Sequence, residues 1–202
     1  MATTLPVSNS TPRAVKKPKQ AQFVSLDGRI RVEDWAKLPE TKPHYELIDG
    51  VLKQKMPTRN KHAYAASRLM MLLSFWGDGK GWIFLTEGGG VTADGFNGFV
   101  PDMMGFTPET PPLPDEIYAN SPYVVAEVAS PSTKKVDRET KMRGYARAEI
   151  QIYLLVDSDA KTFEVYRLEN EKYGAPEILK ENDIWQPAEL PGLALELSKL
   201  WM

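Results

Sequence analysis

A carboxylate interrupts an otherwise apolar run at Tyr123-Val124-Val125-Ala126-Glu127-Val128. Such a run is typical of a strand that other elements cover on both faces of a sheet. A charged carboxylate in that position is costly unless it is paired, hydrogen-bonded or bound to a metal ion. The run therefore indicates a buried Glu127 that has a partner. The alternative is an edge strand from which Glu127 points into water.

A second acid lies on a strand that precedes this run. Asp102 follows Pro101 within the strand predicted over 99–106, and 25 residues separate it from Glu127. That spacing allows a loop to return the chain as a neighbouring strand, so the two carboxylates can meet. They would repel each other unless a divalent cation neutralised them, and Mg²⁺ typically uses one or two carboxylates with water and substrate phosphate. Such a pair suits the hydrolysis of a phosphodiester.

A lysine on the next predicted helix is a candidate to act with these acids. The helix covers 134–147 and follows Ser130-Pro131-Ser132-Thr133, whose hydroxyl groups can cap it. Lys141 and Tyr145 lie one turn apart on one face of this helix. An ammonium group near the acids would stabilise charge that develops on a phosphate. The alternative is an exposed Lys141 that pairs only with Asp137.

The composition excludes several kinds of chemistry. The 202 residues include no cysteine and only two histidines, His44 and His62. A disulfide framework, a thiolate nucleophile, an iron–sulfur cluster and a Cys-ligated zinc are excluded, and a His-rich metal site is disfavoured. Carboxylates, lysines and hydroxyl groups remain, with oxygen-ligated cations as natural cofactors. No apolar run approaches the roughly 18 residues of a membrane span, so we expect a cytoplasmic protein without membrane contact.

The charge divides the chain into two parts. Residues 1–22 carry four basic residues and no acid, which predicts a disordered basic tail. Such a tail can contact phosphates, serve as a solvated leader or act as a transit peptide. Because the whole chain has a net charge of −2, the remaining residues 23–202 carry −6 and form a mildly acidic single domain.

The remaining pattern predicts an α/β domain. Asp49-Gly50 is a strong hairpin signal between two short strands over 45–55. The glycine run at 88–90 lacks the Gly-Lys-Ser/Thr of a phosphate loop, which favours a bulge or turn. The other predicted elements are a short helix over 34–37, a helix over 61–76, an interrupted strand over 82–93 and a strand pair over 153–157 and 162–166.

Glu46 lies on the first strand of the predicted hairpin. In a regular strand, Glu46 and Ile48 share one face, which would point the carboxylate inward. A surface glutamate at the start of a hairpin is the alternative. Tyr153 and Tyr166 are expected in the core or at a dimer interface, since the chain lacks the interleaved basic and aromatic residues of a strand-binding groove.

The motifs together resemble a known family. They are Tyr-Glu-Leu-Ile-Asp-Gly at 45–50, Pro101-Asp102, Glu-Val-Ala-Ser-Pro-Ser-Thr at 127–133, Lys141 with Tyr145, the strand pair, and Leu-Pro-Gly-Leu-Ala-Leu-Glu-Leu at 190–197. In this order they are similar to the Uma-two family of restriction endonucleases, within the PD-(D/E)xK nuclease superfamily. The resemblance covers nearly everything after the tail.

The resemblance implies a restriction-endonuclease-like core with a mixed central β-sheet flanked by α-helices. It also implies Asp102 and Glu127 as ligands of Mg²⁺, with Mn²⁺ as a substitute, Glu46 as a third acid, and often a homodimer. The sequence departs from the superfamily at Ala129, where a lysine is expected. In such families a lysine from the following helix substitutes, and Lys141 fits that role.

Two functions therefore follow as hypotheses. The first is a metal-dependent endonuclease that hydrolyses DNA, with Asp102, Glu127, Lys141 and Glu46 as its catalytic set. The second is a module of the same fold that binds nucleic acid or protein without turnover. An acidic domain needs a local basic patch to approach a polyanion. We therefore ask whether the helix cations rim the acidic pocket or scatter; these are Lys134, Lys135, Arg138, Arg143 and Arg147.

Overall fold

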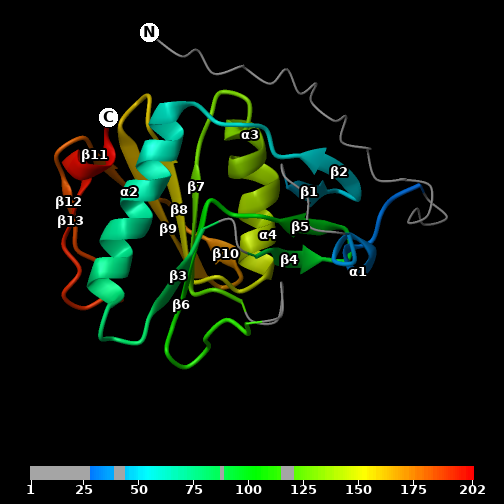
Figure 1. Ribbon diagram of the computed structural model, residues 1–202, viewed down its shortest axis with the longest axis horizontal. Helices are drawn as coiled ribbons and strands as arrows, with labels where there is room; N and C mark the ends of the chain where they lie inside the picture. The colour runs from blue at the N-terminus through cyan, green and yellow to red at the C-terminus, as the bar shows by residue number, and fades with distance from the viewer. Residues whose placement is uncertain (1–27, 39–43, 87–88, 115–120) are drawn as a thin grey trace, which may run out of the picture.

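A mixed seven-stranded sheet forms the centre of the molecule (Figure 1). The computed structural model describes residues 28–38, 44–86, 89–114 and 121–202, so the predicted tail over 1–22 lies outside the described residues. The strand order is β10-β9-β8-β7-β6-β3, with β11 paired to β9. Only β7 and β8 are parallel among these pairs. The strands are β3 (Ile83–Leu85), β6 (Met103–Phe106), β7 (Val124–Val128), β8 (Ile152–Asp157), β9 (Thr162–Glu169), β10 (Lys172–Tyr173) and β11 (Glu177–Lys180).

The apolar run around Glu127 forms β7, which lies between β6 and β8 and is buried along its whole length. Val124, Ala126 and Val128 pack in the same core as α2 (Asn60–Gly77). Val125 packs in a second core with Tyr145 of α4 (Met142–Arg147). Figure 1 shows β7 running between these two helices. Glu127 therefore belongs to a covered central strand, and the edge-strand alternative is wrong.

A second, four-stranded sheet has the order β2-β1-β5-β4. The predicted hairpin over 45–55 is confirmed as β1 (Tyr45–Ile48) and β2 (Val51–Gln54). Asp49 and Gly50 both have positive φ angles, 51° and 77°, as a type I′ hairpin turn requires. The short helix α1 (Val32–Trp35) begins two residues before the predicted 34–37, so the prediction of its bounds is wrong.

Two of the predicted strand segments are each divided between the two sheets. The segment 82–93 gives β3 to the large sheet and β4 (Val91–Asp94) to the small one. The segment 99–106 follows the end of β5 (Asn97–Phe99) in the small sheet and continues into β6 of the large one. Pro101 lies at this second crossing and has no N–H group to donate to a ladder. The prediction of a continuous strand there is wrong, and the crossing puts Asp102 at the junction of the sheets.

The helices follow the predictions with one difference. The predicted helix over 61–76 is confirmed as α2. The helix over 134–147 is present, but its middle is the π-helical turn η2 (Asp137–Lys141) between α3 (Lys134–Val136) and α4. The strand pair is confirmed as antiparallel β8 and β9. The chain ends with the paired strands β12 (Ile184–Trp185) and β13 (Leu195–Glu196) and the 3₁₀ turn η3 (Leu197–Leu200).

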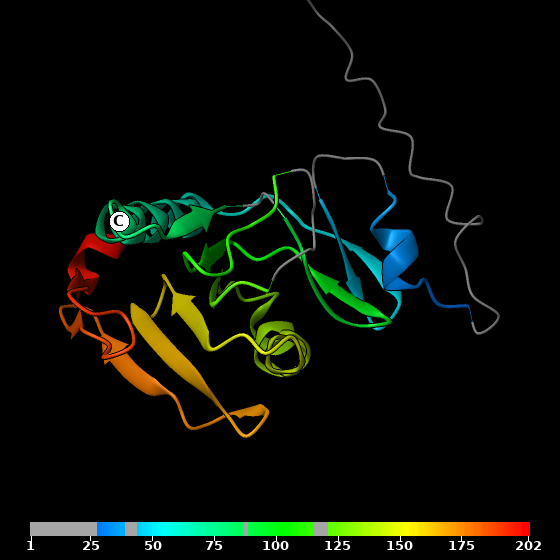
Figure 2. The same cartoon turned by 90° about the horizontal axis from the view of Figure 1, so that it is seen from below.

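The two tyrosines that were expected in the core lie there. Tyr153 and Tyr166 are buried in the core beneath α4, as expected. Figure 2 shows the same arrangement from below, with α2 and α4 well separated. Within the described ranges, none of the helices has the length and apolarity needed to cross a membrane.

Close packing of α4 depends on Gly144. A Cβ atom at this position would lie 2.3 Å from Cε2 of Phe99, which is fully buried. We expect Gly144→Ala to lower the free energy of unfolding by about 1–3 kcal/mol, because the ring and the helix must move apart. Urea denaturation measures this. The exposed neighbour Arg143 gives the control, since Arg143→Ala should change stability by less than about 0.5 kcal/mol. Equal effects of the two substitutions would contradict the close packing.

The ion pair between Arg138 and Glu164 ties the helix to β9. Both terminal guanidinium nitrogens of Arg138 donate hydrogen bonds to the Glu164 carboxylate, and the Tyr166 hydroxyl donates a third. Burial alone would raise the pKa of Glu164, but the hydrogen bonds from Arg138 and Tyr166 lower it below its usual 4.5. A depressed carboxyl pKa stabilises the fold above the unfolded value, and this contribution is lost as the pH falls through the folded value.

We expect Glu164→Gln to lower the free energy of unfolding near pH 7. The difference from wild type should shrink as the pH is lowered from 7 through the depressed folded pKa, because Glu164 then becomes protonated in both states. Denaturation curves over this pH range measure this. A difference that stays constant with pH would contradict the role of the carboxylate charge.

Candidate functional site

A pocket of about 550 Å³ opens at the carboxyl end of β7. It is lined by the β1–β2 hairpin, the segment that leads from β2 to α2, the residues that follow β7, the η2 turn and the β8–β9 turn. All four residues selected from the sequence line this pocket, namely Glu46, Asp102, Glu127 and Lys141. They come from four separate segments, which the two sheets bring together.

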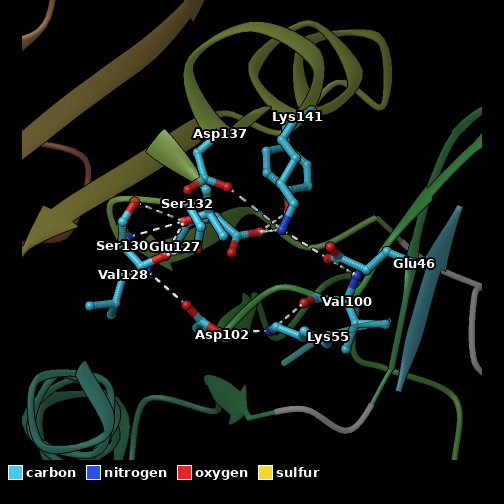
Figure 3. A network of polar contacts seen from close by, with 12 residues as sticks. Glu46, Lys55, Val100, Asp102, Glu127, Val128, Ser130, Ser132, Asp137 and Lys141 are labelled. Atoms are coloured by element: carbon cyan, nitrogen blue, oxygen red, sulfur yellow. Dashed lines mark hydrogen bonds and ion pairs between the residues drawn. The ribbon is translucent and has the colours of Figure 1, made fainter. Parts of the chain in front are cut away.

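Lys141 is the centre of the acidic cluster (Figure 3). Its Nζ lies 2.8 Å from Oε1 of Glu46, 2.8 Å from Oε1 of Glu127 and 3.8 Å from Oδ1 of Asp137. The side chain is 3% exposed. The predicted alternative is therefore wrong about exposure, although the pair with Asp137 exists. One ammonium group serves three buried carboxylates, which together raise the pKa of Lys141 against the effect of burial.

Glu127 points from β7 towards the η2 and α4 helices. Its Oε1 accepts hydrogen bonds from Lys141 Nζ and from the Tyr145 hydroxyl, and within the described residues its Oε2 accepts none. Burial raises the pKa of Glu127 to about 8, because the charge of Lys141 opposes that rise only in part. The charged form of Glu127 would gain from a further positive group in the pocket.

Asp102 is held beside Glu127 by strand pairing. Met103 of β6 pairs with Ala126 of antiparallel β7. At the next position along the two chains, Asp102 therefore lies opposite Glu127. Oδ2 of Asp102 accepts the Val128 N–H at 2.8 Å. The prediction that neighbouring strands bring the two carboxylates together is confirmed.

Two cationic or polar groups also contact Asp102. Lys55 Nζ lies 2.7 Å from Oδ1, and His62 Nε2 lies 3.3 Å from Oδ2. Burial alone would raise the pKa of Asp102, but the hydrogen bond from His62 and the charge of Lys55 lower it below its usual range. Asp102 therefore stays ionised at neutral pH.

Glu46 points into the pocket from β1 together with Ile48, as its strand position predicts. Its Oε1 accepts the Val100 N–H at 3.1 Å as well as the Lys141 ammonium. Val100 lies at the crossing between the sheets. Glu46 therefore joins the small sheet to the cluster on the large one.

Three residues of the site were not predicted as site residues: Lys55, His62 and Asp137. Of these, Asp137 was predicted only as an ion-pair partner of Lys141. The segment 53–62 holds four Lys or Arg residues and one histidine but no acid, and this clustering was a usable signal for Lys55 and His62. Asp137 is 1% exposed, and its Oδ1 has no hydrogen-bond partner among the described residues. Nothing in the sequence marked Asp137 as buried.

The hydroxyl groups that follow β7 do not cap the helix. Thr133 occupies the N-cap position without a side-chain cap hydrogen bond. Instead its Oγ1 accepts the Ser130 N–H, and the Ser130 hydroxyl lies 3.0 Å from that of Ser132. The expected capping role is wrong, and these three hydroxyl groups line the pocket.

The five helix cations do not rim the pocket. Lys134 pairs with Asp157, Arg138 with Glu164 and Arg147 with Asp94. These cations therefore give no support to nucleic-acid binding, and on that criterion they weaken the nuclease hypothesis. The positive charge at the pocket comes instead from Lys141 and from residues 53–61, which span the end of β2 and the start of α2.

The carboxylate oxygens of the pocket are possible ligands of a metal ion. No group of three or more His, Asp or Glu side chains placed to hold a metal occurs in the described part of the chain. Mg²⁺ requires less, because one or two carboxylates with water and substrate phosphate are its usual ligands. Asp102 and the Glu127 Oε2, which accepts no hydrogen bond within the described residues, are hard oxygen donors of this kind. The chemistry of these two donors therefore suits Mg²⁺.

A mixed sheet with helices and a lysine-bound acid cluster at the end of its central strand is the architecture of a restriction-endonuclease-like α/β protein. The model of the Uma2 family, described as "Putative restriction endonuclease", matches residues 32–198, and the chain belongs to this family. Both the expected family and the expected fold class are confirmed. No match was found among the curated proteins.

A solved structure shows the same fold. It is that of "a putative nuclease belonging to DUF820" from Anabaena variabilis ATCC 29413, and its sequence is 23% identical to this chain. The match covers 85% of this chain and 97% of that one, with a TM-score of 0.70. The likeness extends to almost the whole of the related protein, which supports a shared architecture.

Removal of the shared ammonium group tests the cluster. We expect Lys141→Ala to lower the free energy of unfolding by about 3–5 kcal/mol, because three buried carboxylates lose their cation. Lys134→Ala removes a more exposed pair and should cost less than about 1 kcal/mol. Chemical denaturation of both variants measures the difference. Equal small losses would show that Lys141 does not neutralise the cluster.

Proposed function

We propose that this protein is a Mg²⁺-dependent endonuclease that hydrolyses phosphodiester bonds in DNA, with Mn²⁺ as a substitute cofactor. Membership of a family described as restriction endonucleases supports this class of reaction. The observation that carries the proposal is the position of Asp102, just before β6, beside Glu127 of the paired strand β7, with Lys141 hydrogen-bonded to Glu127. The homodimer implied by the resemblance stays a prediction.

Each residue has a role in this proposal. Asp102 and Glu127 would hold the metal ion, which would lower the pKa of a water molecule and offset negative charge on the phosphate. Glu46 orients a water molecule or the metal. Lys141 fixes the positions of Glu46 and Glu127 and adds positive charge near the reacting phosphate. In the reaction the water oxygen bonds to phosphorus while a sugar oxygen leaves and takes up a proton.

One observation favours the second hypothesis, a binding module without turnover. Lys55 neutralises Asp102, and Lys141 serves Glu127 and Glu46, so the acids have cationic partners without any metal. A pocket that is neutralised internally does not require a cofactor for its stability. A direct assay of turnover separates the two hypotheses.

Cleavage of labelled DNA tests the proposal. We expect products with Mg²⁺ or Mn²⁺ and none in EDTA. Asp102→Asn and Glu127→Gln should each lower the rate by at least about 100-fold, since each removes charge from the reacting centre. The exposed Glu171 gives a matched control, and Glu171→Gln should cleave like wild type.

Two results would contradict the proposal. Cleavage that persists unchanged in Asp102→Asn and Glu127→Gln would place the activity elsewhere. A folded wild-type protein that binds nucleic acid but yields no product with either metal ion would support the binding module instead.

A further inference from the structure

The segment 53–61 forms a basic wall of the pocket. It contributes Lys53, Lys55, Arg59 and Lys61 to the lining and contains no acid. Lys53 and Arg59 are exposed and have no ion-pair partner within the described residues. Unpaired cations beside a cluster of buried acids do not neutralise that cluster. They are free to contact an anion that enters from solvent.

The opposite wall is formed mainly by hydroxyl groups. Ser130, Ser132, Thr133 and Ser158 line it, together with Asp159. Hydroxyl groups donate hydrogen bonds to phosphate and sugar oxygens. A nucleic-acid backbone between the walls would therefore meet cations on one side and hydroxyl donors on the other.

An ion pair joins two of the segments that line the pocket. Lys61 at the start of α2 lies 3.4 Å from Asp159 in the β8–β9 turn, measured from Nζ to Oδ1. In Figure 1 the chain from β2 to α2 runs past the end of β7. Asp102 and Glu127 line the same pocket and are only 7% and 3% exposed. A scissile phosphate must therefore enter the pocket to reach these acids.

The burial of the two acids discriminates between forms of DNA. In a duplex each phosphate is attached to a stiff, two-stranded body, which cannot follow its phosphate into a pocket of about 550 Å³. A single strand has no partner strand and can bend into the pocket. Its phosphates can then follow the basic wall while its bases contact aliphatic side chains, since Ile48, Met56, Pro57 and Val128 supply the apolar lining.

We propose that the pocket takes single-stranded DNA, or a single-stranded end, in preference to duplex DNA. Lys53 and Arg59 contact the backbone phosphates that flank the scissile one. This proposal rests on the proposed function for the same site and names the form of its substrate. No Phe, Tyr or Trp lies among the described lining residues, so binding depends mainly on phosphate contacts rather than on base stacking. We therefore expect little dependence on sequence and a strong dependence on salt.

Binding without turnover provides the test. The full-length protein in EDTA is titrated into a fluorescent oligonucleotide, single-stranded in one series and annealed to its complement in the other. We expect the single strand to bind at least about 10-fold more tightly. The double variant Lys53→Gln/Arg59→Gln should weaken that binding at least about 10-fold and lower the salt-dependence slope by about 0.7 for each phosphate that the variant no longer neutralises. The exposed lysine on β10 supplies the control, and Lys172→Gln should bind like wild type.

The outcomes separate this proposal from the proposed function. Equal or tighter duplex binding, unchanged binding by the double variant, or no binding to either form would overturn the single-strand proposal. Preferential cleavage of duplex DNA with Mg²⁺ would overturn it as well, while leaving the endonuclease function in place. Tight single-strand binding without cleavage would support the single-strand proposal and contradict the endonuclease. Circular dichroism melting of the variants excludes loss of fold as the cause.

Discussion

Glu127 occupies the middle of a central strand that is covered on both faces, where its carboxylate is 3% exposed. A charge in such a place is tolerated only with partners, and both come from the helical segment on one side of the sheet. Lys141 lies in the η2 turn and Tyr145 in α4, and each donates to the same Glu127 oxygen. The π-helical turn also places Asp137 near this ammonium group, and Gly144 allows α4 to pack closely enough to hold the arrangement.

The junction between the two sheets supplies the rest of the cluster. The chain leaves the small sheet after β5 and enters the large one at β6, with Asp102 between them. Val100 donates its N–H to Glu46 of β1 and accepts a hydrogen bond from Lys55, which directly follows β2, at its carbonyl oxygen. The crossing between the sheets therefore fixes both of these side chains. The site therefore depends on the relative position of two sheets that each lack part of it.

Charge is distributed locally in a way that the net value conceals. The domain is acidic overall, and three of the five helix cations pair with Asp157, Glu164 and Asp94. At the pocket itself, Lys53 and Arg59 have no ion-pair partner within the described residues. An acidic protein can thus present a narrow basic path to its acid cluster, because solvent and counter-ions screen the more distant charges.

Local patterns in the sequence determined the hairpin at Asp49-Gly50, the helix α2, the strand β7 and the meeting of Asp102 with Glu127. Turn chemistry and hydrophobic period act over a few residues, and strands that follow each other along the chain usually become neighbours in a sheet. The family resemblance added Glu46 and favoured a site role for Lys141 over a surface pair with Asp137. Only the tertiary structure decided that Lys141 is buried among three acids, that the strand around Pro101 is split between sheets, and that Lys55 and His62 contact Asp102. These contacts join residues far apart in the chain, where burial and sheet packing, rather than local preference, fix the outcome.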